Sequence, residues 1–452
     1  MTDSDHGLTV VITGDSTVNM RLSSCHEQGF ASLIEMVRSA DIAFTHVEAT
    51  MHDFTGPELY PAAEGGWIWM RSPRFAAEEL RWAGFDIVSL AGNHSLDYSY
   101  GGLFATWDAL AAAGLKHAGT GRNLAEARAP VYVETPKARV ALVSMSSSFP
   151  AWARAGAQRH DFAGRPGLNP FRWFYAAGRD ELASVKTVAK ELGWWVTASG
   201  PHVILNPPGT HNTIYRFVES DEPGIKMVAD QDDVAGNLRS VTEAKRNADL
   251  VIVQLHNHEW DPVSNSIAVP PPFVQPFAHA AVDAGADVFV AQGSHAPLRG
   301  IEVYQGRPIF YDPGDFIKMS RTTERQPADF YLRPDYHPTA RAWNATFSEG
   351  QDAKESAYSP INPPAAYSTK PGVVLARCHF ASSGRFDKIE LVPVNFLSKP
   401  RSALGIPTAA SGGAATAVLE HIRRLSKPFG TDIRIKGDRG FVTSDQTSLE
   451  ES

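Results

Sequence analysis

The sequence predicts an α/β protein, in which short buried strands alternate with amphipathic helices. Four stretches end a helix-like segment and pass through an Asp into a short apolar run: SADIAF (39–44), GFDIVSL (84–90), NADLVIV (247–253) and GADVFV (285–290). Segments before two of these runs, PRFAAEELRWA and FVQPFAHAAVDA, carry apolar residues at helical spacing. Alternation of strands and helices is typical of this fold class.

The remaining segments predict further strands, two long insertions and a C-terminal extension. We expect strands in LTVVITG (8–14), KARVALVSMSS (137–147), PPGTHNTIYRFV (207–218), GVVLARCHF (372–380) and FDKIELVPVNF (386–396). The insertion at about 149–234 reads as aromatic- and Pro-rich loop around one helix, RDELASVKTVAKELGWW, and 317–370 reads as an irregular lid or subunit-contact loop. A helix, TAVLEHIRRLSKPFG, precedes a polar tail whose last dozen residues we expect to be frayed.

Composition excludes several classes of partner. The net charge of -8 offers no basic surface for nucleic acid and no polybasic patch for a membrane. Cys25 and Cys378 are the only cysteines and have no metal-type spacing, so a reducing compartment is the simpler interpretation, although one disulfide stays open. The N-terminus lacks the charged and apolar regions of an export signal. We therefore expect a cytoplasmic protein with a small-molecule substrate, and the sequence leaves a homo-oligomer open.

Five predicted strands end in polar, chemically active residues. The residues at these ends are Asp15, then His46 and Glu48, then Asn93, His94 and Asp97, then His256, His258 and Glu259, and finally His295. In α/β sheets the carboxyl ends of strands converge, and ligands bind there. Each residue alone is more simply a turn former or helix cap, and Asp97 has even odds of being a cap. Their agreement predicts a site.

Carboxylates and imidazoles that converge in space are ligands for a divalent metal that activates water. We predict Asp15, Glu48, Asn93, His256 and His295 as the ligands of one or two ions, with Glu48 suited to bridge two. Mixed oxygen and nitrogen ligands favour Mn, Zn or Fe. His94 follows Asn93 directly and should point elsewhere, which suits a general acid oriented by Asp97.

Six motifs follow one another along the chain: TGDSTVN, THVEAT, AGNHSLDYSYGG, LHNHEW, GSHAPLRGIEVYQGRPIFYDPGDF and SKPFGT. In this order they resemble the motifs of the CapA family of poly-γ-glutamate capsule biosynthesis-type proteins. The resemblance implies a metallophosphatase-like four-layer αββα sandwich over 8–395, with 396–452 packed on it as a helix and tail. It also implies metal-dependent hydrolysis, often of γ-glutamyl amide bonds, although some members serve polymer synthesis or export.

The sequence departs from the family's pattern at named positions. Pro297 and Ser294 stand where the family often has His, while His46 and Asp315 stand where Asn is usual. The loss at Pro297 weakens one of two metal positions, and we hold His46, His258, Glu259 or Asp315 as additional or supporting ligands. His256 and His258 alternate in a strand-like stretch, so we expect only His256 to face the site.

The sequence says less about the substrate than about the metal site. The stretch GRPGLNPFRWF (164–174) offers Arg165 and Asn169, and Arg clamps planar carboxylates well. A surface loop stiffened by prolines is an equal alternative. Our leading hypothesis is a hydrolase of an amide or ester bond in a small, carboxylate-bearing molecule. A phosphoesterase, a metal-assisted lyase and a non-catalytic capsule-polymer assembly protein are the alternatives.

Overall fold

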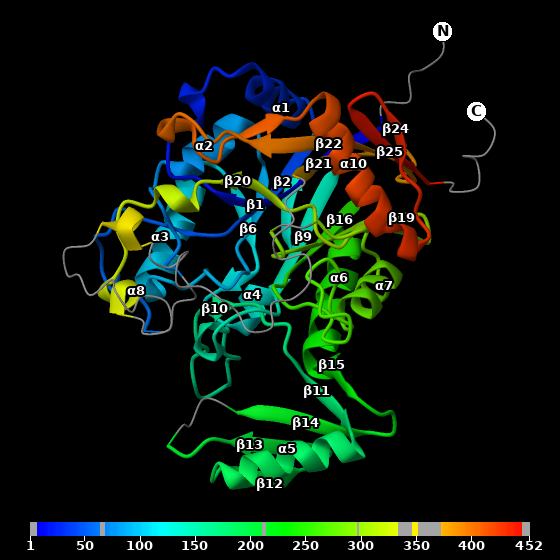
Figure 1. Ribbon diagram of the computed structural model, residues 1–452. Helices are drawn as coiled ribbons and strands as arrows, with labels where there is room; N and C mark the ends of the chain where they lie inside the picture. The colour runs from blue at the N-terminus through cyan, green and yellow to red at the C-terminus, as the bar shows by residue number, and fades with distance from the viewer. Residues whose placement is uncertain are drawn as a thin grey trace.

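Two large sheets form the centre of the protein (Figure 1). The computed structural model describes residues 7–63, 68–209, 214–295, 298–332, 346–350 and 372–444. One sheet has six strands, in the order β18 (Ile301–Tyr304), β19 (Arg307–Phe310), β17 (Val288–Gln292), β16 (Leu250–His256), β9 (Arg139–Ser146) and β8 (Val131–Glu134). The other has ten, in the order β24 (Arg434–Lys436), β25 (Arg439–Thr443), β22 (Phe386–Phe396), β21 (Val373–Phe380), β1 (Leu8–Thr17), β2 (Ile42–Val47), β5 (Ile87–Ser89) and β6 (Lys116–Ala118), with β20 (Asp315–Lys318) on β1 and β23 (Pro407–Ala409) on β22.

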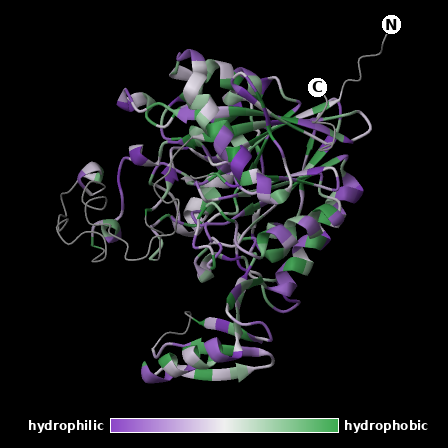
Figure 2. Cartoon of the chain, turned by 45° about the vertical axis from the view of Figure 1, so that its right-hand side comes forward, coloured by the Kyte–Doolittle hydropathy of each residue, from purple (hydrophilic) through white to green (hydrophobic). Residues whose placement is uncertain are grey.

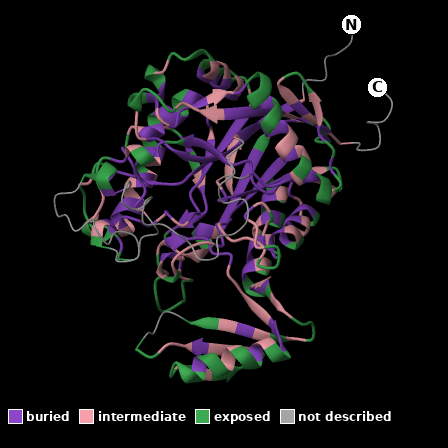
Figure 3. Cartoon of the chain, viewed as in Figure 1, coloured by how far each residue is buried: buried purple, intermediate pink, exposed green. Residues whose placement is uncertain are grey.

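Alternate side chains of the strands face two different cores. In β16, Leu250 and Ile252 pack into the cluster that also contains Val10 of the ten-stranded sheet. Val251 and Val253 belong instead to a second cluster, shared with the helices α6 (Gln231–Asn247) and α7 (Val274–Asp283). Such alternation is expected for a sheet that is buried on both faces. Figure 3 shows the resulting band of buried strands through the molecule.

Helices cover the ten-stranded sheet as well. Apolar residues of α1 (Gln28–Arg38), α2 (Ala76–Ala83), α3 (Ser99–Ala112) and α10 (Gly412–Ser426) join the cluster formed by that sheet. The predicted α/β fold, with facing sheets and outer helices, is confirmed. Smaller elements complete the body: the pairs β3 (Thr50–Met51) with β4 (Arg71–Ser72) and β7 (Thr120–Gly121) with β10 (Gly167–Leu168), and the helix α4 (Leu124–Arg128).

The Asp that precedes each predicted strand has a common role. Asp41 Oδ2 accepts a hydrogen bond from the amide of Thr9 at 2.8 Å. Asp86 accepts in the same way from Ala43 at 3.0 Å. The other two members of the pattern are Asp249, which accepts from Arg139 at 2.8 Å, and Asp287, which accepts from Val251 at 2.9 Å. Each carboxylate thus satisfies the amide near the start of the neighbouring strand and aligns the two strands.

The insertion at 149–234 differs from the prediction of mostly loop. It contains a five-stranded sheet, in the order β12 (Trp195–Ser199), β13 (His202–Asn206), β14 (Tyr215–Ser220), β11 (Trp173–Gly178) and β15 (Ile225–Ala229), covered by α5 (Arg179–Glu191). Figure 1 shows this unit below the two large sheets. Its own cluster includes Leu182, Leu205 and Phe217. Figure 2 shows a mixture of polar and apolar residues in it, which explains why its strands are weak signals in the sequence.

The other insertion and the tail are partly described. β20 and α8 (Ala328–Leu332) lie within 317–370, while residues 333–345 and 351–370, and with them most of the predicted lid, lie outside the described residues. We expect the last dozen residues, 441–452, to be frayed. This expectation is wrong for 441–443, because these residues belong to β25, which pairs with β22. Cys25 and Cys378 are both free thiols, which removes the disulfide alternative. Among the described residues, no helix combines the length and apolar character needed to cross a membrane.

Two glycines allow β20 to lie against β1. A Cβ atom on Gly14 would lie 1.4 Å from the carbonyl oxygen of Gly314, so the two chains touch through their backbones. The next residues, Asp15 and Asp315, are register partners in the β1–β20 pair. Close backbone contact therefore brings two acidic side chains together.

We predict that Gly14→Ala destabilises the protein, because the added methyl group forces β1 away from β20. The expected cost is about 1–3 kcal/mol or more, seen as a lower melting temperature in thermal unfolding. Gly413→Ala in α10 is the matched control, because nothing lies within 4 Å of a Cβ there. Equal melting temperatures for the two variants would contradict this account of the β1–β20 contact.

Candidate functional site

Side chains from both large sheets meet at the carboxyl ends of their strands. Three overlapping groups have ligand atoms within 4.8 Å of one another, and their members are Asp15, His46 and His256, then Glu48, His256 and His258, then Asp15, Glu48, His295 and Asp315. The β1–β2 pair and the β16–β17 pair are both parallel, so each pair delivers its polar ends to one edge. The site thus lies where the two sheets converge.

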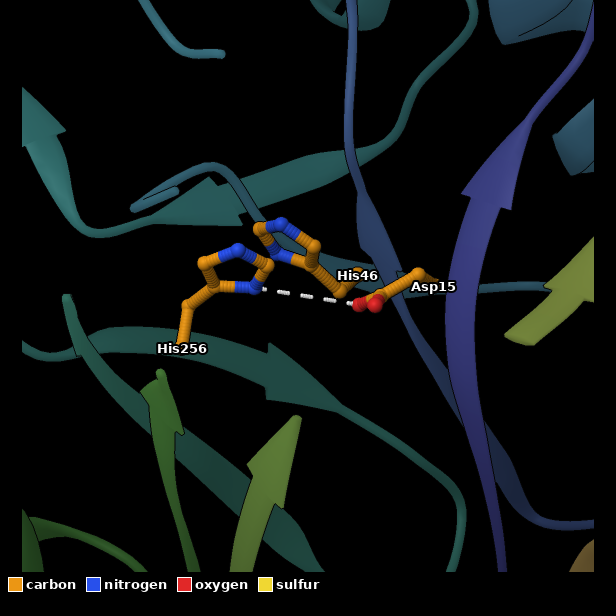
Figure 4. Close-up of side chains that lie close together, drawn as sticks. All are labelled: Asp15, His46 and His256. Carbon is orange, nitrogen blue, oxygen red and sulfur yellow. Dashed lines mark ion pairs between the residues drawn. The ribbon is translucent and has the colours of Figure 1, made fainter. Parts of the chain in front are cut away.

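The first group joins the two sheets through stacked imidazoles. The rings of His46 and His256 stack with centroids 4.6 Å apart, and His256 Nδ1 lies 3.8 Å from Asp15 Oδ1 (Figure 4). His46 Nδ1 is hydrogen-bonded to Ser89 Oγ at 2.7 Å, and its Nε2 is buried without a hydrogen-bond partner. Burial, followed by the charges of His94 and His295, lowers the pKa of His46 to about 3. A neutral ring with a free lone pair is the form that binds metals.

Glu48 lies at the centre of three histidines. Its Oε1 atom is 3.8 Å from His256 Nε2, 3.8 Å from His258 Nε2 and 3.7 Å from His295 Nε2. Burial raises the pKa of Glu48, although the charges of His295 and His94 oppose the shift. A carboxylate at this place is within reach of ligand atoms in two of the three groups.

His295 and Asp315 form the third side of the cluster. His295 Nδ1 lies 2.8 Å from Asp315 Oδ1 and 3.5 Å from Asp15 Oδ2. Asp315 also pairs with Lys318, and this cation together with His295 outweighs burial and lowers the pKa of Asp315. Gly293 has a positive φ of +119, and His295 itself is left-handed with φ +61. Backbone strain of this kind is common at functional sites.

The residues at the site fit a divalent transition metal. Both carboxylate oxygens of Asp15, Glu48 Oε1, His46 Nε2 and His256 Nδ1 are buried without a hydrogen-bond partner. Burial and then the neighbouring Glu48 raise the pKa of Asp15 well above its ordinary value. Buried polar atoms are normally paired, and a cation among these acceptors would satisfy them together. A set of carboxylate oxygen and imidazole nitrogen atoms suits a divalent metal.

The loop after β5 places two adjacent polar residues in different surroundings. Asn93 Oδ1 lies 3.0 Å from His256 Nε2, whereas His94 Nδ1 lies 2.6 Å from Asp97 Oδ2. Asp97 is itself held by the amide of Met70 at 2.6 Å. Burial lowers the pKa of His94, but the charge and hydrogen bond of Asp97 outweigh it and leave this pKa raised. Adjacent residues therefore point to different partners, one in the cluster and one beside it.

Three residues at the site were not predicted from the sequence. Gly92 lets the loop pass the cluster, because a Cβ there would lie 2.8 Å from His46 Nε2. Ser89 orients His46, and Lys318 pairs with Asp315. A glycine before Asn93 is a sequence signal that the backbone passes close to another group. Ser89 and Lys318 carry no such signal, because only strand pairing brings them to His46 and Asp315.

The structure corrects two predicted roles. His256 is not alone in facing the site, because His258 Nε2 lies 3.0 Å from His256 Nε2. Both histidines face the site because β16 ends at His256, and strand alternation no longer governs the residues beyond it. Asn169 does not reach a substrate, since its amide donates to Ser144 O at 2.8 Å and to Asn237 Oδ1 at 2.7 Å in the core.

The other predicted residues are placed as follows. Glu259 belongs to none of the three groups, and it accepts hydrogen bonds from Ser147 Oγ at 2.7 Å and Trp173 Nε1 at 3.0 Å. Glu259 therefore lies outside the cluster. Arg165 is exposed and lines a cavity described below. Pro297 lies outside the described residues, so its effect on the cluster stays a prediction.

Facing sheets with outer helices, and acids and histidines where the sheets converge, define an α/β protein with a candidate metal site at its strand ends. Residues 9–320 match the family described as bacterial capsule synthesis protein PGA_cap. This chain belongs to that family.

Three proteins illustrate what this chain is similar to. It is 31% identical over 452 residues to an uncharacterized protein, y4sH, of Sinorhizobium fredii, covering 96% of this chain and 93% of that one. It is 26% identical over 255 residues to the capsule biosynthesis protein CapA of Bacillus anthracis, covering 56% of this chain and 45% of that protein. A solved phosphatase of Mycoplasma pneumoniae aligns with 11% identity and a TM-score of 0.35, covering 85% of this chain and 92% of the other.

We predict that Asp15→Asn weakens binding of Mn²⁺ or Zn²⁺ at least about 100-fold, because it removes a buried anion from two of the three groups. Titration calorimetry and elemental analysis measure the loss. Without metal, the variant should melt at a temperature no lower than that of the metal-free wild-type protein, since a neutral amide replaces an unpaired buried carboxylate. Asp108→Asn, an exposed acid on α3, is the control. Unchanged metal affinity in Asp15→Asn would exclude Asp15 as a ligand.

Proposed function

We propose that this protein is a metal-dependent hydrolase that cleaves an amide or ester bond of a small, carboxylate-bearing molecule. The observation that carries the proposal is the buried set of carboxylate and imidazole atoms without hydrogen-bond partners at the strand ends. Asp15, Glu48, Asn93, His256 and His295 would hold one or two ions of Mn, Zn or Fe, with His46, His258 and Asp315 as additional ligands. When bound, such a metal activates water and polarises the bond under attack.

The chain's own residues supply proton transfer. Asp97 occupies Nδ1 of His94, which leaves Nε2 to donate a proton to the departing nitrogen or oxygen atom. Asp97 is a positioning residue, held in turn by the Met70 amide, and it fixes the orientation of the His94 ring. This division keeps the acid separate from the metal ligands, since Asn93 contacts His256 and His94 does not.

Family membership supports a second role, because relatives are named for capsule biosynthesis. A non-catalytic assembly protein would fit those names, yet it has no use for the His94–Asp97 pair beside the cluster. A phosphoesterase or a metal-assisted lyase would use the same ligands on a different substrate. We extend the proposal to a cytoplasmic location, and we leave assembly into a homo-oligomer open.

We predict that His94→Ala keeps its metal but loses about 100- to 10,000-fold in turnover, because the general acid is removed and the ligands remain. Elemental analysis of protein purified without chelator gives the metal content. Hydrolysis of γ-glutamyl-p-nitroanilide, p-nitrophenyl acetate and bis-p-nitrophenyl phosphate gives the activity and separates amide, ester and phosphoester chemistry.

Two controls make the test decisive. His295→Ala should lose both metal and activity, whereas His421→Ala on α10, away from the cluster, should lose neither. Stoichiometric metal without turnover of any of the three substrates would favour the assembly role. Protein without transition metal, or loss of metal in His94→Ala, would overturn the assignment of ligands and acid.

A further inference from the structure

A cavity of about 820 Å³ lies between the loop after β9 and the first strands of the inserted sheet. Its walls come from the stretch around Ser147–Arg165, from β11 and from the start of β14. Volumes of this size suit a small organic ligand. No residue of the proposed metal cluster lines the cavity, so it is a separate feature of the molecule.

Four arginines line this cavity, and two of them are neutralised. Arg172 binds Asp233 through Nε at 2.6 Å and Nη2 at 3.0 Å. Arg216 binds Asp230 at 2.5 Å. These two pairs hold the inserted sheet to the body, and they leave little positive charge for a ligand.

The other two arginines, Arg154 and Arg165, form no ion pair in the part of the chain that the structure describes, and only the more distant Asp233 and Asp230 attract Arg154. Arg165 donates through Nε and Nη2 only to the backbone oxygen of Arg154, at 3.2 Å each. Among the described residues, neither Arg154 nor Arg165 has a carboxylate within 4.0 Å. Burial, and then the charges of Arg172 and Arg165, lower the pKa of Arg154. Cations gathered in a partly dehydrated cavity repel one another, and an anion between them relieves that repulsion.

Aromatic rings form the rest of the walls. Trp173 and Tyr175 meet edge to face with centroids 5.2 Å apart, and the Arg216 guanidinium lies 4.3 Å from the centroid of the Phe174 ring. Trp152 and Tyr215 add two further rings. Packed rings present apolar surface at low entropic cost, so they suit a ligand with an aromatic or apolar body.

The cavity adjoins the candidate site through one carboxylate. Ser147 and Trp173 both line it, and both donate to Glu259, the residue after His258. The backbone amide of Ser147 also donates to His256 O at 2.9 Å. A ligand in the cavity would therefore lie one layer of side chains from the histidines.

We propose that this cavity binds a small anion with an aromatic or apolar body, whose terminal oxyanion is paired by Arg154 and Arg165. The rings hold the body, and the far end of the ligand reaches toward the metal cluster. Only this last step rests on the proposed function, because binding in the cavity needs neither metal nor turnover.

Binding of three matched probes tests the proposal: N-acetylphenylalanine, its neutral amide and phenyl phosphate. Calorimetry on chelator-treated full-length protein should show the carboxylate binding at least about 10-fold more tightly than the amide. Arg154→Gln and Arg165→Gln should each remove that preference, with unchanged melting temperature. Arg159→Gln is the control, because Arg159 is exposed, pairs with Asp161 and does not line the cavity.

The outcomes separate the two proposals. Equal affinity for acid and amide, no binding of any probe at millimolar concentration, or unaltered binding in both Arg variants would overturn the cavity assignment. Tighter binding of phenyl phosphate than of the carboxylate would support it and identify the oxyanion as a phosphate. Anion binding that persists when metal content and turnover tests fail would leave the cavity assigned and remove the hydrolase.

Discussion

The site depends on one repeated constraint: the Asp before a strand accepts a hydrogen bond from a backbone amide of the neighbouring strand. Asp41 and Asp86 align β1, β2 and β5 in one sheet, and Asp249 and Asp287 align β9, β16 and β17 in the other. Parallel strands that start side by side end at the same edge of the sheet, because they rise by nearly the same length per residue. The β1–β2 register shifts by one residue between Ile12 and Asp15. The polar residues at their far ends are therefore delivered to one edge, where Asp15 is the register partner of His46.

That convergence has an energetic cost that explains the chemistry of the cluster. Burying an unpaired carboxylate costs on the order of several kcal/mol, and Asp15 and Glu48 both bear that cost in the structure. The pKa of each is raised, while the pKa of His256 is lowered well below its ordinary value by burial and by its neighbours His46 and His258. A cation would lower the pKa of both carboxylates, since it stabilises their charged form, and it would bind the neutral imidazole that a lowered pKa already favours.

The same physics decides how far the sequence could predict this protein. Fully buried strands are visible because both faces are apolar, and so β2, β16 and β17 and their polar ends were predicted. The inserted strands β11–β15 were largely missed, because they are short, half-exposed and mixed in polarity. Asn169 in a Pro-rich stretch resembles a surface residue, yet tertiary packing buries it completely. Local pattern predicts elements, whereas pairing and burial decide which side chain reaches the site.

Glu259 connects the correctly predicted part of the molecule with the missed one. It lies one residue beyond His258, and the inserted sheet reaches it through Trp173 Nε1. Trp173 is the first residue of β11. Its hydrogen bond to Glu259 therefore fixes the aromatic wall of the cavity relative to the segment that follows β16. A loop insertion with no contact to the cluster could vary without consequence for the site. Here the cavity wall and the histidine-bearing segment are joined by one carboxylate, so the insertion is built into the architecture of the site rather than attached beside it.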